Sequence, residues 1–154
     1  MSKEIDKKKV VELLNKILEL ELAGVVRYTH YSFMVYGFNR IPIISWLRAQ
    51  ADESLLHAQQ AGEMITALGE HPSLGLGRLL ETQKHDVGAI LQEALEHEAE
   101  GLKHYRNLLE LVEGRDIMLE EYARTMVHQE QLHSYEVDKM LRKPGDVGTF
   151  QSTK

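Results

Sequence analysis

The chain has 154 residues, of which 43% are hydrophobic and 27% are charged, and its formal net charge is −6. This length fits one domain with a substantial core, and a composition with only three prolines argues against a disordered chain. Because acidic residues outnumber basic ones and no long run of Lys or Arg is present, we expect no nucleic-acid partner.

The chain carries no sign of a membrane-spanning or exported segment. No apolar run reaches the ~18 residues that a transmembrane helix requires. The segment Met1-Ser2-Lys3-Glu4 lacks the apolar stretch of a signal peptide. We therefore expect a cytoplasmic protein with no membrane partner.

The sequence contains no cysteine. Disulfides, thiolate nucleophiles, iron–sulfur clusters and cysteine-type zinc sites are therefore excluded. Any metal ion must be bound by Glu, Asp and His, a donor set that favours iron, manganese or zinc.

Apolar residues at helical spacing, together with capping residues, predict four helices and no strand. The third helix should follow Asp86, a good N-cap, and the fourth should end before Pro144-Gly145. The expected ranges are about Val10 to Tyr36, Pro42 to Leu68, from just after Asp86 to Val112, and Asp116 to Arg142.

The connection lengths predict the topology. The first and third connections are short, so each pair of helices should form an antiparallel hairpin. The middle connection, residues 69–85, can extend to ~56 Å, whereas a helix of about 27 residues is ~40 Å long. The fold class is therefore all-α, an up-down-down-up four-helix bundle with one long crossover. We place this domain at residues 1–143, followed by a flexible tail at 144–154.

The two predicted hairpins look like copies of one another. A Glu-x-x-Gly-x-x-x-Tyr pattern occurs in the first and third helices, and 32 residues after each of its glutamates comes another Glu, followed by a His. Coincidence among Glu-rich helices is the alternative to a true repeat. The matched pairs are Glu21 and Glu98, Gly24 and Gly101, Tyr28 and Tyr105, Glu53 and Glu130, and His57 and His133.

Each predicted helix directs an acidic or imidazole side chain toward its apolar stripe. Burial of a lone carboxylate is costly, and several carboxylates cannot neutralise one another. Two divalent cations would balance them, with glutamates chelating or bridging the ions and one imidazole nitrogen for each ion. Iron suits this donor set, with manganese or zinc as alternatives. The candidate metal-ligating and catalytic residues are Glu21, Glu53, His57, Glu98, Glu130 and His133.

On these residues the chain resembles the ferritin and bacterioferritin family, over roughly Leu14 to Leu141. The segment Glu130-Gln131-Leu132-His133 matches the family's Glu-x-x-His ligand pair. The resemblance implies a ferritin-like bundle that oxidises ferrous iron with oxygen or peroxide, for iron storage or detoxification, and we expect a homo-oligomer. It also implies specific roles for five residues: Glu21 and Glu98 as terminal ligands, Glu130 as a bridge, and His57 and His133 as nitrogen ligands.

The sequence departs from that family at three places. The second bridging Glu should lie three residues before His57, but Ser54 stands there and Glu53 lies four before. A π-bulge would correct this offset; without one, the site is asymmetric or one ion is weakly bound. Leu55 replaces the Met that ligates haem in bacterioferritins, so we expect no haem. The residues after Arg142 lack the periodicity of a fifth helix.

Other polar residues are interpreted conservatively. His97 and His104, with Glu93 and Glu100 between them, are expected on a solvated face. Tyr28 and Tyr105 could hydrogen-bond the carboxylates or simply pack in the core. Four further histidines have no partner set visible in the sequence: His30, His71, His85 and His128.

Two other functions remain open at this stage. One is a rubrerythrin-like di-iron peroxidase or oxidase that acts as a small oligomer. The absence of Cys for a rubredoxin-type iron disfavours it, whereas the tail without a fifth helix favours it. The other is a metal-free helical interaction module, with Ser54 marking a decayed site.

Overall fold

The computed structural model describes residues 4–150. Met1, Ser2 and Lys3, at the start of the segment searched for a signal peptide, lie outside the described residues, as do residues 151–154 of the predicted tail. The described part contains four helices and no strand, as predicted. They are α1 (Lys7–Met34), α2 (Arg40–Ala67), α3 (Val87–Val112) and α4 (Ile117–Leu141).

Capping residues define the helix starts. The side chains of Asp6, Asp86 and Asp116 each accept a hydrogen bond from a backbone N–H three residues later, which satisfies one of the unpaired donors of the first turn. The first and second helices begin earlier than the periodicity predicted, at Lys7 and Arg40. Apolar spacing marks only the buried part of a helix, so it missed an exposed, charged first turn such as that of α1.

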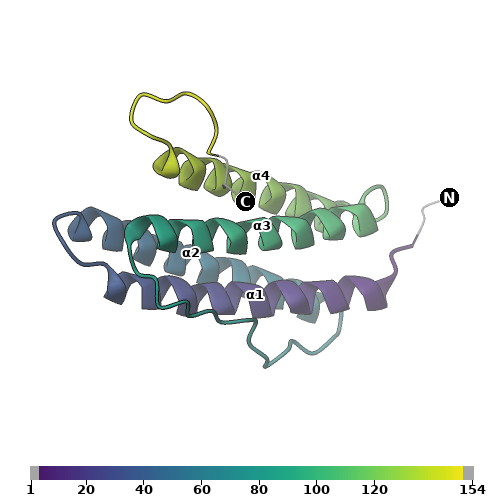
Figure 1. The fold of residues 1–154 in the computed structure, drawn as a ribbon. Coiled ribbons are helices and arrows are strands. Elements are labelled where there is room, and N and C mark those ends of the chain that lie inside the picture. Colours follow the sequence, from purple (N-terminus) through teal and green to yellow (C-terminus); the bar gives the residue numbers. More distant parts are fainter. Residues whose placement is uncertain (1–3, 151–154) are drawn as a thin grey trace.

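The long crossover makes α2 and α3 parallel and thereby confirms the up-down-down-up topology (Figure 1). It runs along α1: the Ser73 N–H donates to Asn15 Oδ1 at 2.8 Å, and the Gly77 N–H donates to the Glu19 carbonyl at 2.9 Å. A Cβ at Gly77 would lie 2.8 Å from that carbonyl oxygen, so only glycine permits this approach. The crossover is therefore attached to α1 rather than free.

Two apolar clusters fill the bundle, one towards each end. The first includes Leu14 and Ile65, and the second includes Val35 and Leu47. Along every helix, polar side chains interrupt the apolar stripe between or beside these clusters. The buried polar and charged residues include Glu21, Ser54, His57, His97, Glu98 and Glu130.

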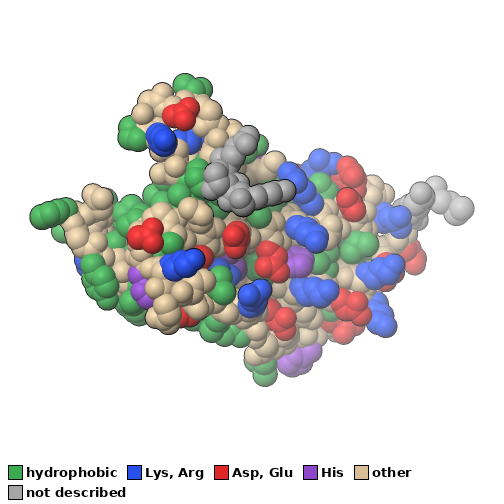
Figure 2. Space-filling view, in the orientation of Figure 1, with side chains coloured by type: hydrophobic (Ala, Val, Ile, Leu, Met, Phe, Trp, Pro, Cys, Tyr) green, Lys and Arg blue, Asp and Glu red, His purple; other side chains and the backbone are tan. Residues whose placement is uncertain are grey.

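The surface does not concentrate one sign of charge. On the face shown in Figure 2, acidic and basic side chains alternate over the helices. No helix in the described part of the chain is long and apolar enough to cross a membrane. After α4 the described residues form no fifth helix; the chain turns back, and the Phe150 N–H donates to Asp138 Oδ2 at 2.8 Å.

Candidate metal centre

The first half of the polar layer consists of Glu21 from α1, His57 from α2 and Glu130 from α4, all buried. His57 Nδ1 lies 3.5 Å from Glu21 Oε1 and 3.3 Å from Glu130 Oε1. One donor atom from each of the three residues lies within 4.8 Å of the others. A single cation could therefore contact all three with small side-chain shifts.

The second half consists of Glu98 from α3 with Glu130 and His133 from α4, and its three donor atoms also lie within 4.8 Å of one another. His133 Nδ1 is 4.0 Å from Glu98 Oε2. The rings of His57 and His133 are stacked, with centroids 6.4 Å apart. Because Glu130 belongs to both groups, it occupies the position of a carboxylate shared between two ions.

Each hairpin orients a carboxylate of the other. Tyr28 of α1 donates its hydroxyl hydrogen bond to Glu98 Oε1 of α3, and Tyr105 of α3 donates to Glu21 Oε1 of α1 at 2.8 Å. Of the two interpretations given for these tyrosines, hydrogen bonding to the site is the one found, and both rings are also fully buried. Each bond leaves the other carboxylate oxygen free to face the layer.

In the absence of cations, protons neutralise part of the layer. Burial alone would lower the pKa of His57, but hydrogen bonds and charge from Glu130 and Glu21 outweigh it and raise the pKa to about 10. Burial, together with the neighbouring Glu130, raises the pKa of Glu98 well above its usual range, against a smaller lowering by Tyr28. An imidazolium and a protonated carboxyl thus balance charge where cations would otherwise do so.

Glu53 lies outside both groups. Its side chain is 34% exposed, and its carboxylate oxygens lie 3.0 Å from His133 Nε2 and 3.8 Å from His57 Nε2. Helix α2 is a regular α-helix through this region, so the π-bulge that would have moved Glu53 inward is not present. Ser54, three residues before His57, is buried instead. Glu53 therefore contacts the nitrogens of the two imidazoles that point away from the carboxylate layer.

His97 was wrongly expected on a solvated face: it is only 6% exposed. Its Nδ1 lies 3.0 Å from Arg27 Nη1, and the same guanidinium donates to the Tyr31 hydroxyl, which in turn donates to Glu93 Oε2. Burial, followed by the nearby charge of Arg27, lowers the pKa of His97 to about 4. This buried network adjoins the carboxylate layer, because the rings of His97 and Tyr28 meet edge to face.

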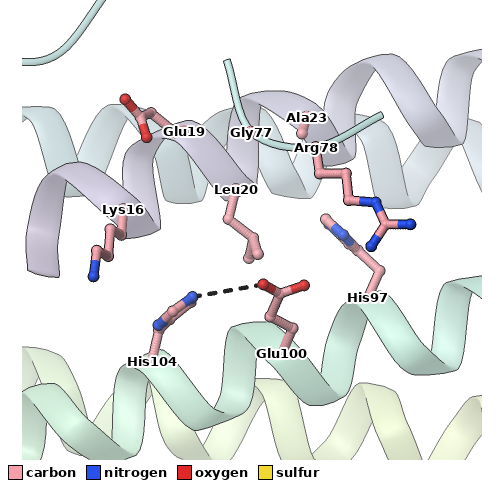
Figure 3. A pocket seen from close by; sticks show the side chains of 9 residues that line it. All are labelled: Lys16, Glu19, Leu20, Ala23, Gly77, Arg78, His97, Glu100 and His104. Carbon is pink, nitrogen blue, oxygen red and sulfur yellow. Dashed lines mark ion pairs between the residues drawn. The ribbon is translucent and has the colours of Figure 1, made fainter. Parts of the chain in front are cut away.

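A cleft of about 310 Å³ opens between α1 and α3 on the outer side of His97. Figure 3 shows Lys16 and Glu19 on α1, Glu100 and His104 on α3, and Arg78 on the crossover around it. Glu100 is exposed and His104 is half-buried, so this part of the expected polar stripe does face solvent. The cleft reaches His97 but none of the carboxylates of the layer lines it.

The donor set fits a pair of iron ions. Each group offers two carboxylates and one imidazole Nδ1, and the charge of three buried glutamates exceeds what His57 alone can balance. Sequence reasoning missed the Gln129 side chain, whose Oε1 lies 3.1 Å from His57 Nε2. Such a partner on the outer nitrogen fixes which ring nitrogen faces the carboxylates.

Comparison with known proteins adds the family and the fold. The family model for the ferritin-like domain matches residues 11–145. No curated protein matches the chain. A ferritin-like, di-iron-carboxylate protein from Bacillus anthracis is similar at 26% identity and a TM-score of 0.83, over 89% of this chain and 98% of that one.

Two further solved structures share the fold. The dodecameric thioferritin of Bacteroides fragilis, a bacterioferritin-related protein, is 20% identical with a TM-score of 0.82, over 90% of this chain and 87% of that one. The Desulfovibrio desulfuricans bacterioferritin, described with its di-iron site, is 23% identical with a TM-score of 0.78, over 88% and 79%.

Proposed function

The chain belongs to the ferritin-like family, and on that premise we propose that its interior layer binds two ferrous ions and oxidises them with oxygen or peroxide, for iron storage or detoxification. The observation that carries this proposal is the pair of three-residue groups that share Glu130. The proposed ligands are Glu21, His57, Glu98, Glu130 and His133. Manganese or zinc would fit the same donors.

Bound iron supplies the electrons that the oxidant takes up, and the protein supplies charge, orientation and protons. When cations enter, His57 and Glu98 must release the protons that balance the layer in their absence, because both groups ligate in their deprotonated forms. Tyr28 and Tyr105 keep their acceptor carboxylates aimed inward. Ordered donors in a buried layer need little rearrangement when charge changes there.

We assign Glu53 a positioning role rather than a ligand role. Its contact with His133 Nε2 favours the tautomer in which Nδ1 is free to bind an ion. This makes the layer asymmetric, with one carboxylate shared between the two ions instead of two. An inward swing of the half-exposed Glu53 side chain would restore the second bridge, and substitution of Glu53 tests both ideas.

The test is oxygen consumption by the purified protein on addition of ferrous salt. We expect His133→Ala to reduce the rate at least about 100-fold, since the loss of a ligand should exceed the 10–100-fold typical of outer partners. The matched control is His128→Ala, an exposed position on the same helix, which should keep the wild-type rate. Equal rates in the two variants would refute the site.

Particle mass separates storage from the rival di-iron oxidase or peroxidase. One observation favours that rival: residues 142–150 turn back onto α4 instead of forming a fifth helix. By analogy with the dodecameric thioferritin, we propose a closed homo-oligomer. Light scattering should then give a mass of many subunits, and mineral retained after iron loading should co-elute with it. A dimer with intact oxidation would support the oxidase.

A further inference from the structure

A second cluster of metal-ligating side chains lies far along the chain from the interior layer. His30 on α1 faces Glu81 and His85, which lie at the end of the crossover just before α3. His30 Nε2 is 2.7 Å from Glu81 Oε2, and His85 Nε2 is 2.9 Å from Glu81 Oε1. One donor atom from each residue lies within 4.8 Å of the others. None of the three contributes to the interior layer.

The backbone around this cluster is attached on both sides. The Thr82 hydroxyl donates to Glu93 Oε1 on α3, and Asp86 caps the same helix through the Ala89 N–H. The Gln83 N–H donates to Glu81 Oε1, the oxygen that also faces His85. Together with the histidines, this bond holds the pKa of the Glu81 carboxyl at about 2, so the group is ionised at neutral pH. The cluster is thus a fixed anion between two imidazoles.

We propose that His30, Glu81 and His85 bind one divalent transition-metal ion of the zinc class, and that this ion fastens the crossover to α1. Two imidazoles and one carboxylate form a three-ligand set that leaves a fourth position for water in tetrahedral coordination. Imidazole nitrogen also favours zinc, copper or nickel over magnesium or calcium, which prefer oxygen.

The present geometry is close to that of a bound site. Zinc bonds of about 2.0–2.1 Å at tetrahedral angles place neighbouring ligand atoms about 3.3 Å apart. The two nitrogen–oxygen distances of 2.7 and 2.9 Å are shorter by a few tenths of an ångström, so a cation entering the cluster would push the donors apart slightly. Both imidazoles would give up their Nε2 hydrogen and keep one on Nδ1.

The alternative is a hydrogen-bonded surface cluster that fastens the crossover without any ion. Zinc titration by calorimetry on the metal-free protein separates the two. We expect His30→Ala and His85→Ala each to lose one zinc equivalent per chain, with affinity at this site reduced at least about 100-fold. Glu81→Gln keeps the shape of the side chain and should lose the same equivalent. The interior layer accounts for the zinc that remains.

His71→Ala is the matched control, because His71 is an exposed histidine at the other end of the crossover. It should keep the wild-type stoichiometry. Trypsin provides a local readout at Lys84, an exposed residue next to His85. Zinc should slow cleavage there in the wild type and the control, but not in the three cluster variants. Unchanged stoichiometry in those variants, or protection that zinc does not affect, would overturn the proposal.

This proposal and the proposed iron oxidation fail independently. The three cluster variants retain every interior ligand, so ferrous oxidation should proceed at the wild-type rate in all of them. Conversely, His133→Ala should lose oxidation while keeping zinc-dependent protection at Lys84.

Discussion

The two hairpins supply matching halves of the interior layer but differ in one carboxylate. In both, a glutamate on the first helix accepts a hydrogen bond from a tyrosine of the other hairpin. In the α3–α4 hairpin the second glutamate, Glu130, is buried and belongs to both ligand groups. In the α1–α2 hairpin its sequence counterpart, Glu53, is 34% exposed and belongs to neither.

The difference follows from a single residue in the connections. Five residues, 35–39, separate α1 from α2, whereas four, 113–116, separate α3 from α4. His57 is therefore 36 residues from Glu21, while His133 is 35 from Glu98. His57 follows the structure and reaches the layer, but Glu53 stays at the same sequence distance as Glu130, one residue short. A helical residue turns about 100°, which is enough to move Glu53 out of the layer.

The largest effect should come from exchanging these two counterparts in turn. Glu130→Gln removes the carboxylate shared by both groups, so we expect ferrous oxidation to fall at least about 100-fold. Glu53→Gln removes an outer partner of His133 and should lower the rate by about 10-fold. Initial rates of oxygen uptake measure both. A larger loss from Glu53→Gln than from Glu130→Gln would mean that Glu53 swings inward and acts as a ligand.

A second asymmetry concerns His97, whose counterpart in the first hairpin is Leu20. The pKa of His97 is lowered from 6.5 to about 4, so the unfolded chain takes up this proton first as the pH falls. The contribution of neutral His97 to stability is intact above about pH 6.5 and is lost progressively towards pH 4. The loss amounts to about 3 kcal/mol at most.

His97→Gln should remove that part of the acid sensitivity. Glutamine retains an acceptor for Arg27 but does not titrate. Urea denaturation of the metal-free proteins at a series of pH values between about 7 and 4 measures the difference. We expect the gap between wild type and variant to narrow as the pH falls. A constant gap would show that His97 is already charged in the folded protein or does not titrate in this range.

Most of the fold could be predicted because it depends on local rules. Asp86 and Asp116 mark helix starts in the sequence and cap those helices in the structure. The repeat predicted that tyrosines and glutamates of the two hairpins would lie near one another. His97 also carried a signal that went unused: it follows Ile90 and Ala94 by seven and three residues, on their buried face of α3.

Two features of the sites lay beyond pattern reading. The cluster of His30, Glu81 and His85 depends on the path of an irregular segment, and no periodicity relates residues 51 positions apart. The position of Glu53 depends on the number of residues in a connection, a quantity that a pattern of residue types ignores. In both cases the deciding fact is where the backbone runs between helices, whereas propensity and periodicity describe only the helices themselves.

The smallest effect should distinguish the paired glycines of the repeat. A Cβ at Gly24 would lie 2.8 Å from Ser54 Oγ and 3.0 Å from His97 Nε2, both buried groups with little freedom to move. At Gly101 its nearest neighbour would be Leu20 Cδ2 at 3.2 Å, the end of a flexible side chain. Overpacking of this kind costs about 1–3 kcal/mol, while replacing a helical Gly by Ala gains about 1 kcal/mol.

We therefore expect Gly24→Ala to destabilise the metal-free protein by about 1–2 kcal/mol and Gly101→Ala to change its stability by less than about 1 kcal/mol. Urea denaturation at neutral pH measures both variants. Ser54 and His97 crowd Gly24 because the first hairpin has a serine where the second has a ligand, so the double variant Gly24→Ala/Ser54→Ala should recover part of the loss. Equal destabilisation by both single variants would mean that the hairpins are packed alike around their glycines, and the asymmetry would then be confined to Glu53.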